Sequence, residues 1–183
     1  MLERYLVEHC SPTLASLKTA NLFSYSYPSE DMLYRYVEAW HQQLSVKGVS
    51  VEVLRKKDNV ALIYVYRRDR LGQDLSHPDT AAFLQDYGYE NLSVTEAIAR
   101  LKGRFEQGEE FPHEIGLFLG YPLGDVKGFI QNAGKNSKCA GCWKVYCDEC
   151  EAVKLFAKFK KCRDVYTRLF QQGRTVLQLT VAV

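Results

Sequence analysis

The stretch from Val49 to Arg67, VSVEVLRKKDNVALIYVYR, gives the clearest indication of the fold. Two runs rich in β-branched and aromatic residues, 49–57 and 60–67, are separated by Asp58-Asn59, a pair typical of the two-residue turn of an antiparallel hairpin. The second run is almost continuously apolar, as in strands that are covered on both faces. The sequence therefore predicts an antiparallel hairpin within a covered sheet.

Helical patterns flank this hairpin. Apolar residues recur at helical spacing over 30–46, after the cap residue Ser29, and the capping box that Ser93 opens begins a second helix over 94–107. Further helices are predicted over 78–87 and over a long amphipathic stretch that follows the cysteines and ends at Gly173.

The remaining β-rich segments are short and lie at 143–146 and 175–183. Because the helices need a common apolar surface, we expect both segments to share one sheet with the hairpin. The predicted fold class is α/β in the broad sense, a mixed α+β fold with a single domain over residues 1–183. Its central sheet would be mostly antiparallel or mixed, with about four to five strands flanked by helices.

Composition favours one domain in a reducing compartment. The 183 residues can bury a substantial core, and no proline-rich, glycine-serine or low-complexity linker divides them. No leader-like segment begins the chain and no run of about 18 apolar residues occurs, so we expect a cytoplasmic protein that does not enter a membrane. The six cysteines are then expected to be thiols rather than disulfides.

Four cysteines form the pattern C-x2-C-x4-C-x2-C within KCAGCWKVYCDEC: Cys139, Cys142, Cys147 and Cys150. Paired cysteines are typical of thiolate sites for zinc or an iron-sulfur cluster. The intervening segment 143–146 is strand-like, however, and would hold the two pairs roughly 16 Å apart, whereas the ligands of one metal lie about 4 Å apart. We predict that the four cysteines do not share one metal, and zinc or an iron-sulfur cluster remains the alternative.

The second cysteine pair has another interpretation. The segment 145–150 is predicted to pass from a strand into a helix, as in a thioredoxin-like dithiol, and a helix N-terminus lowers a thiol pKa. The adjacent carboxylates of Asp148 and Glu149 disfavour the thiolate. A metal- or thiol-dependent redox accessory protein is therefore the alternative function.

The segment 113–131 is predicted to form two short helices that meet near Gly120. This pair resembles a helix-turn-helix, but its second helix offers Lys127 beside Asp125, too little positive charge to neutralise several phosphates. Nucleic-acid binding by such a motif is therefore the least favoured function. Four apolar positions are expected to be buried, Ile115, Leu119, Val126 and Ile130. Glycines recur every four residues and are expected to allow a tight turn and close packing, at 116, 120, 124 and 128.

Positive charge gathers near the end of the chain. Residues 1–132 hold 14 Lys plus Arg against 18 Asp plus Glu, whereas residues 133–183 hold 10 against 4. Six basic residues fall in the long helix: Lys154, Lys158, Lys160, Lys161, Arg163 and Arg168. An acidic protein or an anionic small molecule is therefore a candidate partner.

Catalytic signatures are missing from the sequence. We find no GxGxxG, GxxxxGK, HExxH or GxSxG motif. The four histidines are dispersed, and the adjacent His9-Cys10 is weak support for catalysis or haem ligation beside an ordinary helix end before Pro12. Whether the chain is an enzyme stays open.

Three stretches carry a family resemblance: HCSPTLASLKTANLF at 9–23, HEIGLFLGYPLGDVKGFI at 113–130 and GKNSKCAGCWKVY at 134–146. Together they resemble the uncharacterised family called domain of unknown function 3793, found mainly in anaerobic Firmicutes, over nearly the whole chain. The resemblance implies a shared fold and no mechanism. The pair Cys147 and Cys150 lies outside the family's pattern, which weakens a family-wide four-cysteine site.

The sequence as a whole favours a non-catalytic domain that binds a ligand or another protein. The turn after the first short helix of 113–131 is one candidate surface, because its glycines permit close backbone approach to a ligand. The candidate ligand-binding residues are Gly120, Tyr121, Gly124 and Lys144.

Overall fold

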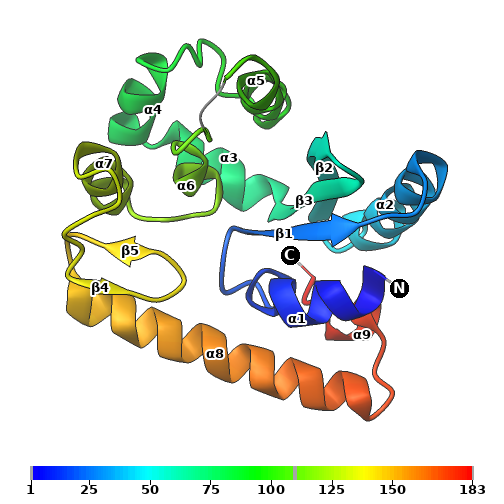
Figure 1. Cartoon of the computed structure of the whole chain (residues 1–183). Helices are drawn as coiled ribbons and strands as arrows, with labels where there is room; N and C mark the ends of the chain where they lie inside the picture. Colours follow the sequence, from blue (N-terminus) through cyan, green and yellow to red (C-terminus); the bar gives the residue numbers. More distant parts are fainter. Residues whose placement is uncertain (1, 109–110, 183) are drawn as a thin grey trace.

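The computed structural model describes residues 2–108 and 111–182, and three strands form its central sheet (Figure 1). β1 (Ala20–Ser26), β2 (Val49–Lys57) and β3 (Val60–Arg67) pair antiparallel in the order β1-β3-β2. Asp58 and Asn59 connect β2 to β3 with positive φ angles of 51° and 59°, as a type I′ turn requires. The predicted hairpin is confirmed.

Strand β1, which the sequence analysis did not predict, pairs with β3 along its whole length and makes β3 the central strand. The side chains of β3 alternate between two cores. Ile63 and Val65 belong to one core, whereas Tyr64 and Tyr66 belong to the other. The expectation that this apolar strand is covered on both faces is therefore confirmed.

The first core lies between the sheet and α1 (Leu2–Leu14), α2 (Glu30–Ser45) and α9 (Val176–Leu179). The helix predicted over 30–46 is confirmed by α2. The strand predicted for 175–183 is wrong, because Thr175 and Gln178 form a reciprocal capping box that begins α9. The backbone N–H groups at this end therefore start a helical turn instead of pairing with the sheet.

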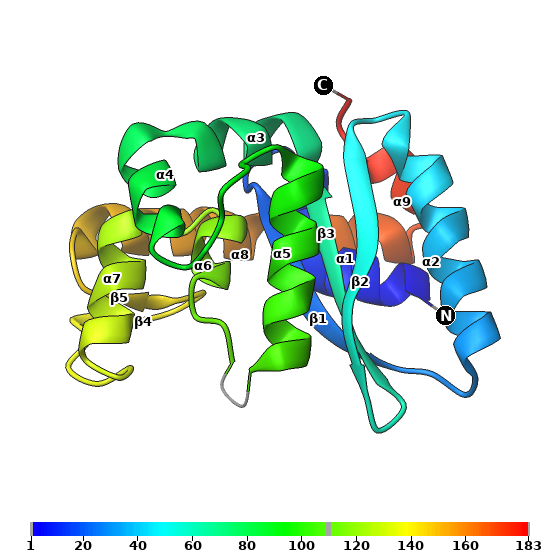
Figure 2. The same cartoon turned by 90° about the horizontal axis from the view of Figure 1, so that it is seen from above.

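The second core lies on the opposite face, under α3 (Arg68–Ser76), α4 (Pro78–Gln85), α5 (Val94–Gln107) and α6 (Ile115–Phe118). Figure 2 shows α2 and α5 on opposite sides of β2 and β3. The predicted bounds of α5 are confirmed, and α4 ends slightly before the predicted residue 87. The hydroxyl of Tyr64 donates a 2.5 Å hydrogen bond to the carbonyl of Phe118, which ties α6 to the central strand.

A third, smaller core joins the β4–β5 hairpin to a long helix. β4 (Cys139–Ala140) pairs antiparallel with β5 (Lys144–Val145), and α8 (Glu149–Gln171) is the predicted long helix. The buried residues of this core are Trp143, Val145, Ala152 and Phe159. The element before the hairpin is α7 (Leu123–Gln131).

The mixed α+β fold in one compact domain is confirmed, but the expected single sheet is wrong in its arrangement. The strands divide into a sheet of three and a sheet of two. The strand expected at 143–146 is β5, and it pairs with β4 instead of with the main sheet. The two-residue β4–β5 hairpin packs on α8. Over residues 2–108 and 111–182, we find no helix with the length and apolar character needed to cross a membrane.

Candidate functional site

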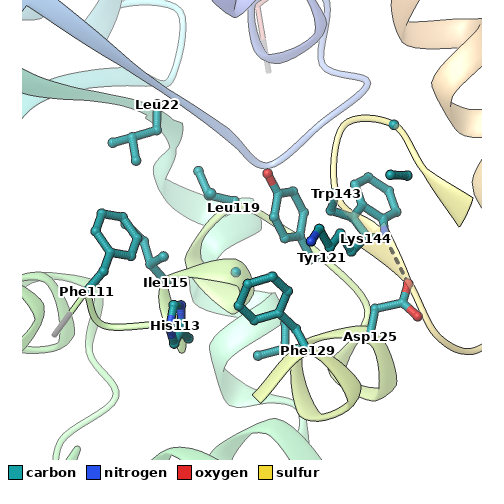
Figure 3. A pocket seen from close by; sticks show the side chains of 14 residues that line it. Leu22, Phe111, His113, Ile115, Leu119, Tyr121, Asp125, Phe129, Trp143 and Lys144 are labelled. Carbon is teal, nitrogen blue, oxygen red and sulfur yellow. Dashed lines mark hydrogen bonds between the residues drawn. The ribbon is translucent and has the colours of Figure 1, made fainter. Parts of the chain in front are cut away.

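A cavity of about 400 Å³ lies where residues 111–129 meet β1 and the β4–β5 hairpin (Figure 3). We call it the aromatic pocket, because aromatic side chains from residues 111–129 and from the hairpin line it. Its lining comprises Leu22, Phe111, His113, Ile115, Gly116, Leu119, Tyr121, Asp125, Val126, Phe129, Ala140, Gly141, Trp143 and Lys144.

The two short helices predicted over 113–131 are confirmed, and they form the floor of this pocket. Ile115, Leu119 and Val126 are buried as expected, whereas Ile130 is half-buried against the same core. The floor is therefore part of the second core, and its shape is fixed by the packing of that core.

Aromatic contacts fix the pocket walls. The rings of Tyr121 and Trp143 stack with centroids 4.8 Å apart, and Trp143 meets Phe156 of α8 edge to face at 4.6 Å. Near the mouth, the exposed imidazole of His113 lies 4.9 Å from the ring of Phe129. Figure 3 shows the side chains of His113, Tyr121, Phe129 and Trp143 grouped around the cavity. Flat apolar surfaces therefore face the pocket from both the α7 side and the hairpin side.

Asp125 holds the hairpin against α7. The residue is only 3% exposed. It accepts hydrogen bonds from the indole Nε1 of Trp143 at 2.8 Å and from the backbone N–H groups of Tyr146 at 2.8 Å and Cys147 at 2.9 Å. Three donors compensate the burial of the charge. Sequence analysis considered Asp125 only as a negative charge beside Lys127; the need of a buried indole for an acceptor was the available signal.

The evenly spaced glycines serve packing, as expected. A Cβ at Gly128 would lie 2.5 Å from the Cβ of Tyr146, and one at Gly124 would collide with the sulfur of Cys147. Gly120 has a φ of +75° and lies against Thr19. Of the candidate ligand-binding residues, Gly120 and Gly124 therefore do not line the pocket, and their lack of a side chain is explained by the turn and by the contact between α7 and the hairpin.

The other two candidate residues, Tyr121 and Lys144, do line the pocket. The ammonium of Lys144 donates a 2.6 Å hydrogen bond to the carbonyl of Gly134 and lies 5.9 Å from the centre of the Phe129 ring. Lys144 is an exposed residue. A positive charge thus stands at the rim of an otherwise apolar cavity.

The cysteines are distributed around the hairpin. Cys139 begins β4, Cys142 lies at the turn, and Cys147 and Cys150 flank the start of α8. Over the described ranges 2–108 and 111–182, we find no group of three or more His, Cys, Asp or Glu side chains that could hold a metal ion. The prediction that the four cysteines do not share a metal stays a prediction, since bound metal has to be measured.

The local chemistry favours thiols over thiolates at two of these cysteines. Partial burial raises the pKa of Cys139, and the carboxylate of Glu149 adds to the shift. Partial burial and the carboxylate of Asp125 raise the pKa of Cys147, although it lies just before a helix. The sequence suggested that Asp148 and Glu149 oppose a thiolate in the second pair. At Cys147 the larger carboxylate effect on the pKa comes from Asp125, and Glu149 acts on Cys139 instead.

Two weaker sequence signals do not form sites. Cys10 is fully buried, which raises its pKa, whereas the neighbouring His9 is exposed and stacks on Phe23 with ring centroids 5.4 Å apart. The imidazole of His9 and the thiol of Cys10 therefore do not form a catalytic or ligand pair, although the two residues are adjacent in sequence. In the helix-turn-helix interpretation, α7 would have to enter a groove of DNA, but one of its faces packs on the hairpin through Gly124 and Gly128.

Comparison with known proteins gives a family. A family model described as "Protein of unknown function (DUF3793)" matches residues 6–180. No curated protein and no solved structure matches the chain. The matched region includes every element of the pocket and almost the whole described chain. The chain therefore belongs to the DUF3793 family of proteins of unknown function, as its resemblance in sequence implied.

Proposed function

We propose that this protein binds a small molecule with a flat apolar part in the aromatic pocket. The observation that carries the proposal is an open, mostly apolar cavity of about 400 Å³ with aromatic walls. Binding sites for small ligands are typically concave, apolar and about 300–1,000 Å³ in volume, with a few polar groups that set orientation.

Preorganisation supports this proposal. The wall formed by Trp143 is fixed on one side by its hydrogen bond to Asp125 and on the other by Phe156. The floor belongs to the second core. A ligand that enters such a pocket orders few side chains, and the entropy that binding costs is correspondingly small.

The polar groups of the lining favour recognition over catalysis. The carboxylate of Asp125 is occupied by three protein donors, so it is poorly placed to act on a ligand. Lys144 and His113 lie at the mouth, where they would contact an electronegative substituent of a bound molecule. We therefore propose a binding protein, and not a thiol-dependent enzyme, as the better account of the site.

The test is a titration with the neutral fluorophore N-phenyl-1-naphthylamine. We expect saturable fluorescence enhancement that is lost in Ala140→Trp, because Ala140 is an exposed residue that lines the pocket and a large side chain there would fill it. The matched control is Ala157→Trp, an equal addition at an exposed position of α8 outside this lining. Equal binding by both variants, or no enhancement with the parent, would show the proposal to be wrong.

A further inference from the structure

A second, more polar cavity of about 190 Å³ adjoins the aromatic pocket, and Leu22, Leu119 and Tyr121 line both. We call it the cationic cavity, because Lys18 and Arg163 line it together. We propose that the cationic cavity binds a carboxylate or phosphate, the anionic end of the molecule whose apolar part occupies the aromatic pocket. This inference rests on the proposed function, and it makes the ligand an amphipathic organic anion.

Lys18 is the main support for an anion site. The residue is 6% exposed, and its ammonium donates one 2.7 Å hydrogen bond, to the carbonyl of Ala20. It also lies 5.1 Å from the centre of the Tyr121 ring. Within residues 2–108 and 111–182 no carboxylate forms an ion pair with it. An ammonium has three donors and a high cost of burial, so this cavity contains a positive charge that lacks a matching anion.

Arg163 adds a second positive charge to the same cavity. It lies on α8, at an exposed position, and forms no ion pair with the part of the chain that the structure describes. Burial, with a smaller contribution from the Arg163 guanidinium, lowers the pKa of Lys18 to about 8. Lys18 is therefore still mostly protonated at pH 7. Two cations that repel each other around one cavity are stabilised when an anion lies between them.

Asn21 adds hydrogen-bond donors to the same cavity. The side-chain oxygen of Asn21 accepts a 2.7 Å hydrogen bond from the hydroxyl of Thr13, so its amide N–H groups are free to face the cavity. The hydroxyl of Tyr121 donates to the carbonyl of Cys142 at 3.2 Å, which fixes the ring between the two cavities. In Figure 3 this hydroxyl points away from the aromatic pocket, toward the N-terminal segment. A single ligand could therefore place its anionic group beside Tyr121 in the cationic cavity and its apolar part in the aromatic pocket.

The experiment compares 1-naphthylacetic acid with its neutral amide, 1-naphthaleneacetamide, as competitors of the neutral fluorophore. We expect the acid to bind at least about tenfold more tightly than the amide, the gain expected from one charge-assisted hydrogen bond. Arg163→Gln should remove most of this preference, mainly by weakening the binding of the acid. Lys161→Gln is the matched control, because Lys161 is an exposed cation of α8 outside the cavity. Lys18→Met should remove the preference completely.

The outcomes separate the two proposals. Equal affinity for acid and amide in the parent overturns the anion site and leaves the apolar pocket intact, whereas failure of both to bind contradicts the proposed function. A further arm titrates inorganic phosphate alone and follows the Arg163 side-chain Nε–H by NMR. A saturable shift that Lys18→Met abolishes supports the anion site even without an apolar ligand, and no shift in the parent counts against it. 1-Naphthyl phosphate, compared with the acid, decides between phosphate and carboxylate.

Discussion

The two hairpins of this protein are stabilised in different ways. The β2–β3 hairpin pairs along all eight residues of β3, and its central strand contributes side chains to two cores. The β4–β5 hairpin has two residues in each strand. A hairpin that short is not stable by its own backbone hydrogen bonds. It is held instead by Asp125 of α7 on one side and by α8 on the other.

The difference explains where the candidate site lies. The position of the β2–β3 hairpin is fixed by its many backbone hydrogen bonds within the sheet. The position of the short β4–β5 hairpin is fixed by the side chains that hold it. Here the anchors place Trp143 and Lys144 opposite the α6–α7 floor, and a pocket remains between them. If this account is correct, changes at α7 should act on the short hairpin and leave the long one folded.

The largest effect is expected for Val126→Asp. Val126 is 4% exposed in the second core, so the substitution buries an unpaired charge and should lower the free energy of unfolding by at least about 4 kcal/mol. Urea denaturation measures the effect. Val153→Asp is the control, because Val153 is 50% exposed on α8. A Val126→Asp variant as stable as the control would contradict the burial of α7.

Asp125→Ala should cost slightly less, about 3 kcal/mol, because it leaves three donors in a buried setting without their acceptor. The comparison of the hairpins predicts a local signature: a large acceleration of amide hydrogen exchange at Tyr146 and Cys147, with exchange in β3 accelerated only as far as the fall in global stability requires.

The control for Asp125→Ala is Asp148→Ala, which removes the cap of α8 and should cost only about 1 kcal/mol. Uniform acceleration of exchange in both hairpins of Asp125→Ala would mean that the short hairpin is not a separately anchored unit.

Gly128→Ala tests the contact of α7 with Tyr146, the residue that follows β5. The added Cβ would lie 2.5 Å from Tyr146, so we expect a loss of about 1–3 kcal/mol in unfolding free energy. Gly103→Ala on α5 is a matched control, since a Cβ there meets nothing within 4 Å and should stabilise the helix by up to about 1 kcal/mol. Thermal melts that shift in the same direction for both variants would exclude close packing as the reason for Gly128.

The same contrast separates what the sequence could predict from what it could not. The β2–β3 hairpin was predictable because turn chemistry and strand composition are local. β1 was missed although Phe23 and Tyr25 alternate with serines, a two-residue period that could have revealed it. The pairing of β4 with β5 is local but only two residues long in each strand, too short to show a strand pattern. The role of Asp125 depends on contacts between segments about 20 residues apart, and no local pattern encodes it.

The smallest effect is expected in the turn of the long hairpin. Asn59 has a φ of 59°, a conformation that asparagine adopts at lower cost than alanine, so Asn59→Ala should cost about 1 kcal/mol. Asn59→Gly should be within about 0.5 kcal/mol of the parent, because glycine adopts positive φ without steric cost. Urea denaturation of the two variants measures the difference.

A loss of unfolding free energy this small would support the view that the paired strands and the two cores stabilise the long hairpin. The turn would then contribute little. A loss from Asn59→Ala as large as that from Asp125→Ala would contradict this contrast, because the long hairpin would then also depend on a single residue. In either case Asn59 lies outside the lining of the aromatic pocket and of the cationic cavity. Its variants should therefore keep the parent's affinity for the neutral fluorophore, which separates stability from binding.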